Sequence, residues 1–158
     1  MCSSDLSDRL LGGRQVLPGI VLTRAMPGFF YWEPNMIERV IATEAALALI
    51  REISAKHGAL MFHQSGGCCD GSAPMCYARG ELQVGAHDVL LGALDGHPFY
   101  MSQAQFEYWQ HTQLIIDAID GNGGMFSLEC GTGRRFLTRS RLYDDAELDQ
   151  LAPVAAAA

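Results

Sequence analysis

The sequence predicts an α+β domain, and three observations support this prediction. A short strand pattern precedes an amphipathic helix, mostly strand patterns follow that helix, and the chain shows no internal repeat. The length of 158 residues fits one compact domain. We therefore expect a mixed or antiparallel β-sheet with one main N-terminal helix and one short helix.

The chain divides into three segments by composition. Residues 1–35 contain glycine and proline breaks without a sustained period, so we expect an irregular extension. Residues 2–6 also match what a common sequencing adapter encodes, which makes the extension a candidate non-native segment. We expect a single α+β domain over residues 36–143. Residues 144–158 are acidic and then alanine-rich, and we expect a flexible tail there.

The main helix is expected over residues 44–56. Thr43 has the residue type of an N-cap, and the charge of Glu44 complements the positive end of the helix dipole. Gly58 follows as a C-terminal glycine. Four apolar residues recur at positions i, i+3, i+4 and i+7 and form one buried stripe, namely Ala46, Leu49, Ile50 and Ile53.

Strand patterns dominate the rest of the domain. Asp95-Gly96 is a typical hairpin turn, and Ser102 to Gln105 has the spacing of a capping box, so a short helix should follow Ser102. The expected strands cover residues 39–42, 59–62, 81–84, 88–94, 98–101, 113–119, 125–128 and 135–142.

The charge balance excludes several classes of partner. Eleven Lys and Arg against 18 Asp and Glu give a net charge of −7, which opposes binding to nucleic acids and to anionic membranes. The longest apolar run, Ala45 to Ile50, is far shorter than the roughly 20 residues of a membrane helix. No secretory signal pattern precedes this run, so we expect a cytoplasmic protein.

The segment from His63 to Cys76 carries the residues with the most chemistry. It holds three of the five cysteines, and glycines flank them. Thiolates are soft ligands that suit iron–sulfur clusters, zinc and copper(I), and glycine lets the backbone approach a metal closely. Adjacent cysteines do not fit the usual zinc spacing. The predicted metal ligands here are His63, Cys68, Cys69 and Cys76, and the predicted cofactor-binding glycines are Gly66 and Gly67.

Two other interpretations of this segment stay open. Cys69 and Cys76 are also compatible with small buried hydrophobic residues, and the glycines with tight turns. Alternatively, Cys68 or Cys69 is a thiolate that His63 activates for attack on an aldehyde or a disulfide.

Two segments resemble the bacterial domain-of-unknown-function family 779. These are Leu60 to Cys76 and Gln105 to Thr112, within a likeness that extends from Val40 to about Leu142. Small proteins of this family are often encoded beside aldehyde dehydrogenases. The resemblance therefore implies a context of aldehyde or alcohol oxidation, with an aldehyde dehydrogenase as the expected partner.

A more distant likeness connects the chain with A-type iron–sulfur carriers. Thr43-Glu44-Ala45-Ala46 and Gly66-Gly67-Cys68 resemble their helix start and glycine–cysteine loop. This implies a HesB-like fold in which Cys68 and a C-terminal Cys-Gly-Cys pair hold the cluster. Here that pair is reduced to Cys130-Gly131-Thr132, so Cys130 joins the predicted ligands, and Cys69 and Cys76 are candidates for the missing ones.

The functional hypothesis is an accessory protein that binds iron or an iron–sulfur cluster through Cys68, and a homodimer that shares the cluster is one form of it. We expect a binding protein rather than an enzyme. The alternatives are a thiol-based redox protein or enzyme that uses Cys68 or Cys69, and a non-catalytic partner of an aldehyde dehydrogenase.

Overall fold

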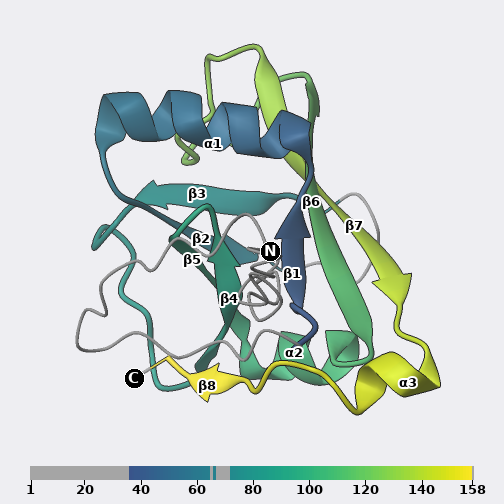
Figure 1. Cartoon of the computed structure of the whole chain (residues 1–158). Helices are drawn as coiled ribbons and strands as arrows, with labels where there is room; N and C mark the ends of the chain where they lie inside the picture. Colours follow the sequence, from purple (N-terminus) through teal and green to yellow (C-terminus); the bar gives the residue numbers. More distant parts are fainter. Residues whose placement is uncertain (1–35, 65, 67–71, 158) are drawn as a thin grey trace, which may run out of the picture. The chain divides into compact units, whose positions relative to one another are not determined.

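The computed structural model describes residues 36–64, 66 and 72–157, which belong to the second of two units of the chain, residues 32–158. This unit is an α+β domain with mixed sheets, as the sequence predicts (Figure 1). Its elements are β1 (Val40–Ala42), α1 (Glu44–His57), β2 (Leu60–Gln64), β3 (Pro74–Ala78), β4 (Asp88–Leu94), β5 (His97–Ser102), α2 (Gln103–Trp109), β6 (Thr112–Asp120), β7 (Arg134–Leu142), α3 (Asp145–Leu148) and β8 (Ala155–Ala156).

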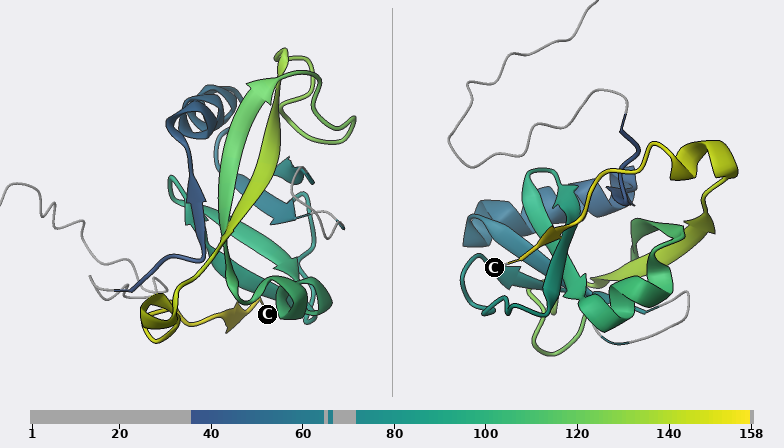
Figure 2. Two further views of the ribbon diagram at one scale, coloured as in Figure 1. Left: turned by 90° about the vertical axis from the view of Figure 1, so that its right-hand side faces the viewer. Right: turned by 90° about the horizontal axis from the view of Figure 1, so that it is seen from below.

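The strands form two sheets. One sheet has three strands in the order β1-β6-β7, and the other has five in the order β3-β2-β5-β4-β8. The β1–β6 and β2–β5 pairs are parallel, and the remaining pairs are antiparallel. The β6–β7 hairpin is regular from Thr112 opposite Leu142 to Asp120 opposite Arg134. Two further views show this long hairpin beside the five-stranded sheet (Figure 2).

Helix α1 forms for the reasons that its sequence indicates. The Thr43 hydroxyl accepts a hydrogen bond from the Ala46 N–H at 3.2 Å, which satisfies one free donor of the first turn. The predicted apolar stripe is buried. The helix ends at His57, and Gly58 follows with a φ of 80°, a conformation that favours glycine.

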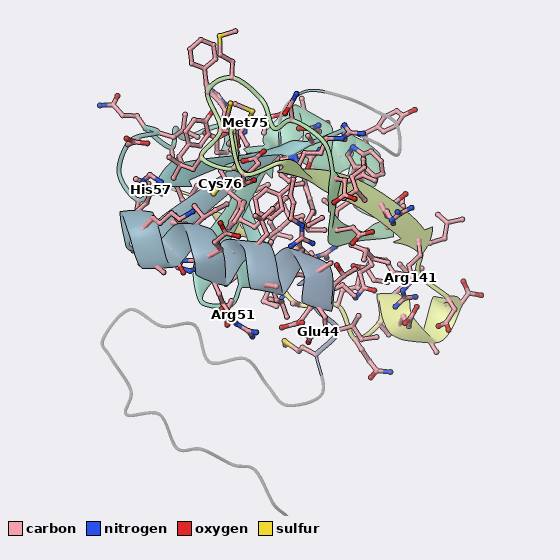
Figure 3. All side chains as sticks on the ribbon, turned by 90° about the horizontal axis from the view of Figure 1, so that it is seen from above. Glu44, Arg51, His57, Met75, Cys76 and Arg141 are labelled. Carbon is pink, nitrogen blue, oxygen red and sulfur yellow. The ribbon has the colours of Figure 1, made fainter. Side chains whose placement is uncertain are left out.

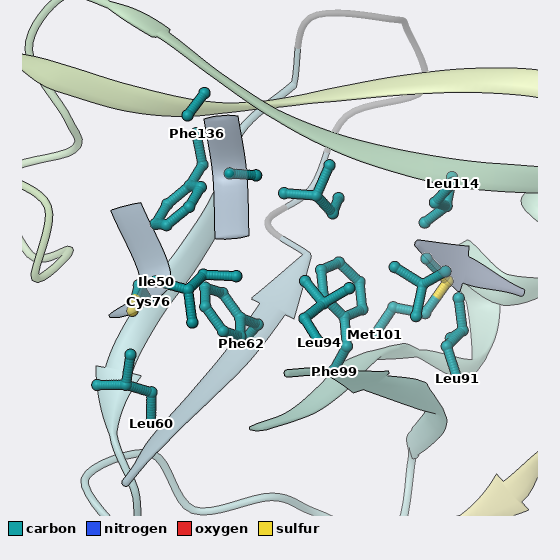
Figure 4. Close-up of a cluster of buried hydrophobic side chains, with 14 of the residues drawn as sticks. Ile50, Leu60, Phe62, Cys76, Leu91, Leu94, Phe99, Met101, Leu114 and Phe136 are labelled. Atoms are coloured by element: carbon teal, nitrogen blue, oxygen red, sulfur yellow. The ribbon is translucent and has the colours of Figure 1, made fainter. Parts of the chain in front are cut away.

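The core lies between the two sheets and beneath α1 (Figure 4). Its centre is aromatic, because Phe62 stacks on Phe99 at a centroid distance of 6.3 Å and meets Phe136 edge-on at 5.5 Å. Each such pair contributes about 1 kcal/mol beyond the burial of its area. These contacts link β2 and β5 of the five-stranded sheet to β7 of the three-stranded sheet, so they hold the two sheets together.

Two predicted strands are absent, and one strand was not predicted. Residues 81–84 and 125–128 form turns and irregular backbone rather than strands. The second turn is closed by bonds from Ser127 N–H to Gly124 C=O and from Cys130 N–H to Ser127 C=O. Conversely, Pro74–Ala78 was expected to be loop and is the edge strand β3, where a first-position proline is tolerated.

The C-terminal segment packs on the domain, although we expected it to fray. Asp144 caps α3, Leu151 pairs with Ile37, and Ala152 is fully buried. Strand β8 then joins the edge of β4. The described part of the chain therefore has three helices rather than the expected two, because an Asp–Glu capping box stabilises a turn that carries no apolar stripe.

Candidate functional site

The candidate site is the connection between β2 and β3. Gly67, Cys68 and Cys69 lie outside the described residues, so the site is defined by the residues around them. Gly66 is exposed and has open space where a side chain would stand. His63, Cys76 and Cys130 are all described, and the structure does not bring them together as one ligand set.

His63 and Cys76 face opposite sides of the sheet. In the antiparallel β2–β3 register, Cys76 lies opposite Phe62 and His63 lies opposite Met75. Directly opposed residues share a face and successive residues alternate, so Cys76 shares the core face of Phe62 while His63 shares the other face with Met75. A metal between β2 and β3 would therefore not take both side chains from these positions.

Cys76 is a buried thiol. Its side chain belongs to the core cluster with Ile50, Leu60 and Phe62 (Figure 4), and the residue is 0% exposed. Burial, and secondarily the charge of Glu129, raises the pKa of the Cys76 thiol far above its ordinary value. A thiol that resists ionisation is a poor nucleophile and a poor ligand, so Cys76 has the environment of a small hydrophobic residue.

His63 has a carboxylate partner that the sequence did not indicate. Its Nε2 lies 3.1 Å from Oδ1 of Asp88, and the two side chains are 23% and 18% exposed. The other oxygen of Asp88 accepts the Gly85 N–H at 2.8 Å. Burial opposes ionisation of Asp88, but the hydrogen bonds from Gly85 and His63 outweigh it and lower the pKa of this carboxyl. With Asp88 ionised, Nε2 carries the imidazole proton and Nδ1 is left as the basic nitrogen.

The two ends of the Gly-Cys segment, residues 65–71, are joined by buried polar groups. Gln64 is 1% exposed, and its amide donates to the Ser72 hydroxyl at 2.7 Å. The Thr138 hydroxyl of β7 donates to the side-chain amide oxygen Oε1 of Gln64 at 2.9 Å, and the Thr138 N–H donates to the backbone carbonyl of Ser72 at 2.8 Å. Gln64, Ser72 and Thr138, here called the anchor triad, therefore fix the start and the return of the segment against a third strand.

The β6–β7 loop, residues 121–133, is bonded to the outer edge of β3. The Cys76 N–H donates to the Ser127 hydroxyl at 2.8 Å, and the Cys76 carbonyl accepts the Leu128 N–H at 2.9 Å. The Ser127 hydroxyl in turn donates to Glu129, whose carboxyl is 1% exposed. Burial raises the pKa of Glu129, and the bond from Ser127 opposes this only in part. The sequence analysis missed these hydrogen bonds because it expected residues 125–128 to be a strand.

Cys130 follows in the same loop and is an exposed free thiol. Among residues 36–64, 66 and 72–157, no three His, Cys, Asp or Glu side chains are gathered as a metal site would require. Of the predicted ligands that the structure describes, Cys76 is buried in the core, His63 contacts Asp88, and Cys130 is exposed.

The fold and the site define a class of protein: a mixed α+β domain that carries a glycine- and cysteine-rich connection beside a histidine–aspartate pair. A family model described as domain of unknown function (DUF779) matches residues 49–142, more than half of the chain, and the chain belongs to this family. A comparison with curated proteins gives no match. Within the described residues, no helix is both long and apolar enough to cross a membrane.

Proposed function

We propose that this chain is a thiol-dependent protein in which Cys68 or Cys69 reacts as a thiolate and His63 is its base. The observation that carries the proposal is the 3.1 Å contact between His63 Nε2 and Asp88 Oδ1. A nucleophile needs a base, and an efficient base is itself held by a third group. Asp88 supplies that third group, and its lowered pKa keeps it ionised at neutral pH.

The spacing and exposure of His63 suit this role. It stands five residues before Cys68 and directly before Gln64, whose side chain belongs to the anchor triad. Its side chain is 23% exposed, so the ring is neither sealed in the core nor free in solvent. Cys76, in contrast, is buried and has a raised pKa, which favours the two cysteines of the Gly-Cys segment as the reactive thiols.

The proposed step balances without a cofactor. Nδ1 of His63 takes the thiol proton, and the thiolate attacks one sulfur of a disulfide, forming a mixed disulfide and expelling the other sulfur as a thiolate, which takes that proton. With an aldehyde, the thiolate adds to the carbonyl carbon and the oxygen takes the proton, giving a thiohemiacetal. The second electrophile matches the aldehyde context that the family resemblance implies.

The test is site-resolved alkylation with iodoacetamide at pH 7 in metal-free protein under reducing conditions, quantified by peptide mass spectrometry. We expect the Cys68–Cys69 peptide to react faster than the exposed Cys130, which is an internal reference. Asp88→Asn and His63→Gln should slow that peptide roughly tenfold or more, since both remove oriented base assistance. His111→Gln, a change at an exposed histidine, is the matched control.

The proposal is wrong if the Cys68–Cys69 peptide reacts no faster than Cys130. It is equally wrong if His111→Gln slows the peptide as much as His63→Gln does. A thermal melt of each variant separates loss of reactivity from loss of fold, because a folded Asp88→Asn protein with unchanged reactivity also contradicts it.

Iron or iron–sulfur binding is the second candidate, and Cys130 is the observation that favours it. Cys130 is an exposed thiol in the loop that is bonded to β3, the strand into which the Gly-Cys segment leads. The ligand set would be Cys68, Cys69 and Cys130, with Gly66 and Gly67 beside the metal, in line with the likeness to A-type carriers. Cys76 is removed from the set by its burial in the core.

Anaerobic purification followed by absorption spectroscopy and iron analysis tests this candidate. Charge-transfer bands and stoichiometric iron should disappear in Cys68→Ala and persist in Cys76→Ala. Colourless protein that iron and sulfide do not reconstitute excludes the cluster. Co-purification with an aldehyde dehydrogenase after replacement of all five cysteines would instead support the role of a non-catalytic partner.

A further inference from the structure

The start of strand β2 is held by a histidine side chain. The Leu60 N–H, at the first position of β2, donates to Nδ1 of His97, the first residue of β5, at 3.1 Å. Leu60 is 0% exposed, so water has no access to replace this acceptor. A ring nitrogen accepts a hydrogen bond only while it carries no proton. The contact therefore requires a neutral His97 with its proton on Nε2.

Two charged groups act on the His97 ring in opposite senses. Asp95, in the turn between β4 and β5, favours the protonated ring, and Arg79, which follows β3, disfavours it. Burial is the largest influence, and together with Arg79 it outweighs Asp95 and lowers the pKa of His97 from its ordinary value of 6.5. Strand β2 contributes the uncharged Leu60 at this point. The fold therefore favours the neutral ring, the form that accepts the hydrogen bond, at pH 7.

Asp95 has a second charged partner, which lies on α1. Arg51 extends from this helix (Figure 3), and its Nε lies 3.4 Å from Oδ2 of Asp95. The two side chains are 59% and 39% exposed, and ion pairs at such exposed positions contribute little to stability. Because Leu94 pairs with His97 across the Asp95-Gly96 turn, the Asp95 carboxylate is also a near neighbour of the His97 ring. Asp95 can therefore exchange Arg51 for a protonated His97.

We propose that His97 is an acid-sensing switch that exchanges the Leu60 N–H for the carboxylate of Asp95 when the ring gains a proton from solvent. In the neutral state, His97 holds the start of β2 and Asp95 pairs with Arg51. In the protonated state, Nδ1 is a donor, so the imidazolium pairs with Asp95 and the Leu60 N–H loses its acceptor.

The opening is local, because the rest of β2 has other contacts. Phe62 stacks on Phe99 in the core, and β2 pairs with β3 along its whole length. The affected strand is nevertheless the one that carries His63, three positions beyond Leu60. Because the folded state disfavours the protonated ring, the stabilising contribution of His97 is complete above pH 6.5 and is lost as pH falls through the lowered pKa.

The test is an NMR titration of the full chain, with ¹⁵N-labelled histidine, from about pH 8 to about pH 4.5. We expect His97 to carry its proton on Nε2 at high pH and to gain one on Nδ1 below pH 6.5. The protection factor of the Leu60 amide against hydrogen exchange should fall roughly tenfold or more with the same midpoint, because the amide loses its acceptor. Protection of the Phe62 amide should change much less.

Substitutions at both partners of the ring separate the switch from general acid damage. His97→Gln supplies an amide oxygen that accepts at every pH, so Leu60 should stay protected throughout. His97→Leu has no acceptor, so Leu60 should be poorly protected throughout. Asp95→Asn removes the partner of the protonated state and should shift the transition to lower pH by roughly half a unit. His111→Gln, at an exposed histidine, is the matched control and should keep the wild-type transition.

Three results would each overturn the proposal. The first is a Leu60 protection factor in the wild type that does not follow the titration of His97, a measurement that does not depend on the folding of any variant. The second is an acid transition at Leu60 that persists in His97→Gln. The third is an unchanged midpoint in a folded Asp95→Asn protein, which would show that Asp95 does not receive the protonated ring.

Discussion

Asp88 and Glu129 are two carboxylates that the fold withdraws from water, and their pKa values move in opposite directions. Asp88 accepts hydrogen bonds from the Gly85 N–H and from His63, and its pKa is lowered. Glu129 accepts from the Ser127 hydroxyl in a more buried place, and its pKa is raised. Burial raises the pKa of both, so the partners decide the direction. The environment of Asp88 favours the ionised carboxylate, whereas the environment of Glu129 disfavours ionisation of a group that is bonded within the β6–β7 loop.

Ser127→Ala should have the largest effect, because it removes one hydroxyl that serves two buried groups. The Cys76 N–H and the Glu129 carboxyl both lose their partner. We expect a loss of about 3 kcal/mol in the free energy of unfolding, measured by urea denaturation. Ser54→Ala, at a partly exposed hydroxyl on α1, is the matched control and should cost less than about 0.5 kcal/mol.

Gly123→Ala should cause the next largest loss of stability, because the backbone of Gly123 lies against the Glu129 side chain. An added Cβ would stand 2.6 Å from Cγ and 2.9 Å from Cδ of Glu129. Since Glu129 is 1% exposed and its carboxyl is held by Ser127, moving the side chain aside would disturb that bond, and we expect a cost of about 2 kcal/mol. Gly124→Ala, whose nearest contact is the Met75 sulfur at 3.4 Å, should be clearly milder. Equal costs for the two variants would contradict the packing described for Glu129.

The pH dependence of stability should separate the two carboxylates. The folded-state pKa of Glu129 is raised, so its contribution is complete below its ordinary value of 4.5 and is lost as pH rises through the raised pKa. Glu129→Gln should therefore match the wild type near pH 4 and melt roughly 3 °C higher at pH 8.

Asp88→Asn should show the opposite sign. The folded-state pKa of Asp88 is lowered, so its contribution is complete above 3.8 and disappears as pH falls through the lowered pKa. The variant should melt below the wild type at pH 7 and approach it toward pH 3. Calorimetry of both variants across this range tests the pair, and parallel profiles would show that burial alone governs both groups.

Glu147 should show the smallest effect, because it is a partly exposed carboxyl with a single cationic partner, Arg141. The two-bond contact with Arg141, assisted by the Asp144 N–H, lowers the pKa of Glu147 to about 2. Arg141→Gln should return this pKa toward its ordinary value of 4.5, as measured by carboxyl chemical shifts in an NMR titration. An unchanged pKa would show that the Arg141 charge is not what stabilises the ionised form.

The sequence predicted those elements whose stability depends on residues near one another in the chain. Helix α1, the Asp95-Gly96 turn and the β6–β7 strands follow from periodicity, capping and turn chemistry within a few residues of each position. The chain after Leu142 was harder, because α3 depends on a capping box and on Arg141, and β8 depends on an edge offered by β4. Short elements of this kind are stabilised by tertiary partners rather than by their own pattern.

In the candidate site, too, local features could be predicted from the sequence and tertiary contacts could not. The Gly-Cys segment stands out in the composition, and its role as the reactive part of the chain stays a prediction, because most of it lies outside the described residues. His63 contacts Asp88, which lies 25 residues later in the sequence. Local sequence patterns do not predict a contact at this separation. Cys76 was misplaced because Pro74 and the glycines before it indicated a loop, whereas pairing with β2 makes the segment a strand.

The anchor triad has a consequence for substitutions in the Gly-Cys segment. Gln64, Ser72 and Thr138 fix both ends of the Gly-Cys segment with groups that stand outside it. Two of these groups lie on β2 and β7 and the third directly follows the segment. The side chains that hold the two ends are thus separable from residues 65–71: a substitution inside the segment leaves each of these hydrogen bonds with both of its partners.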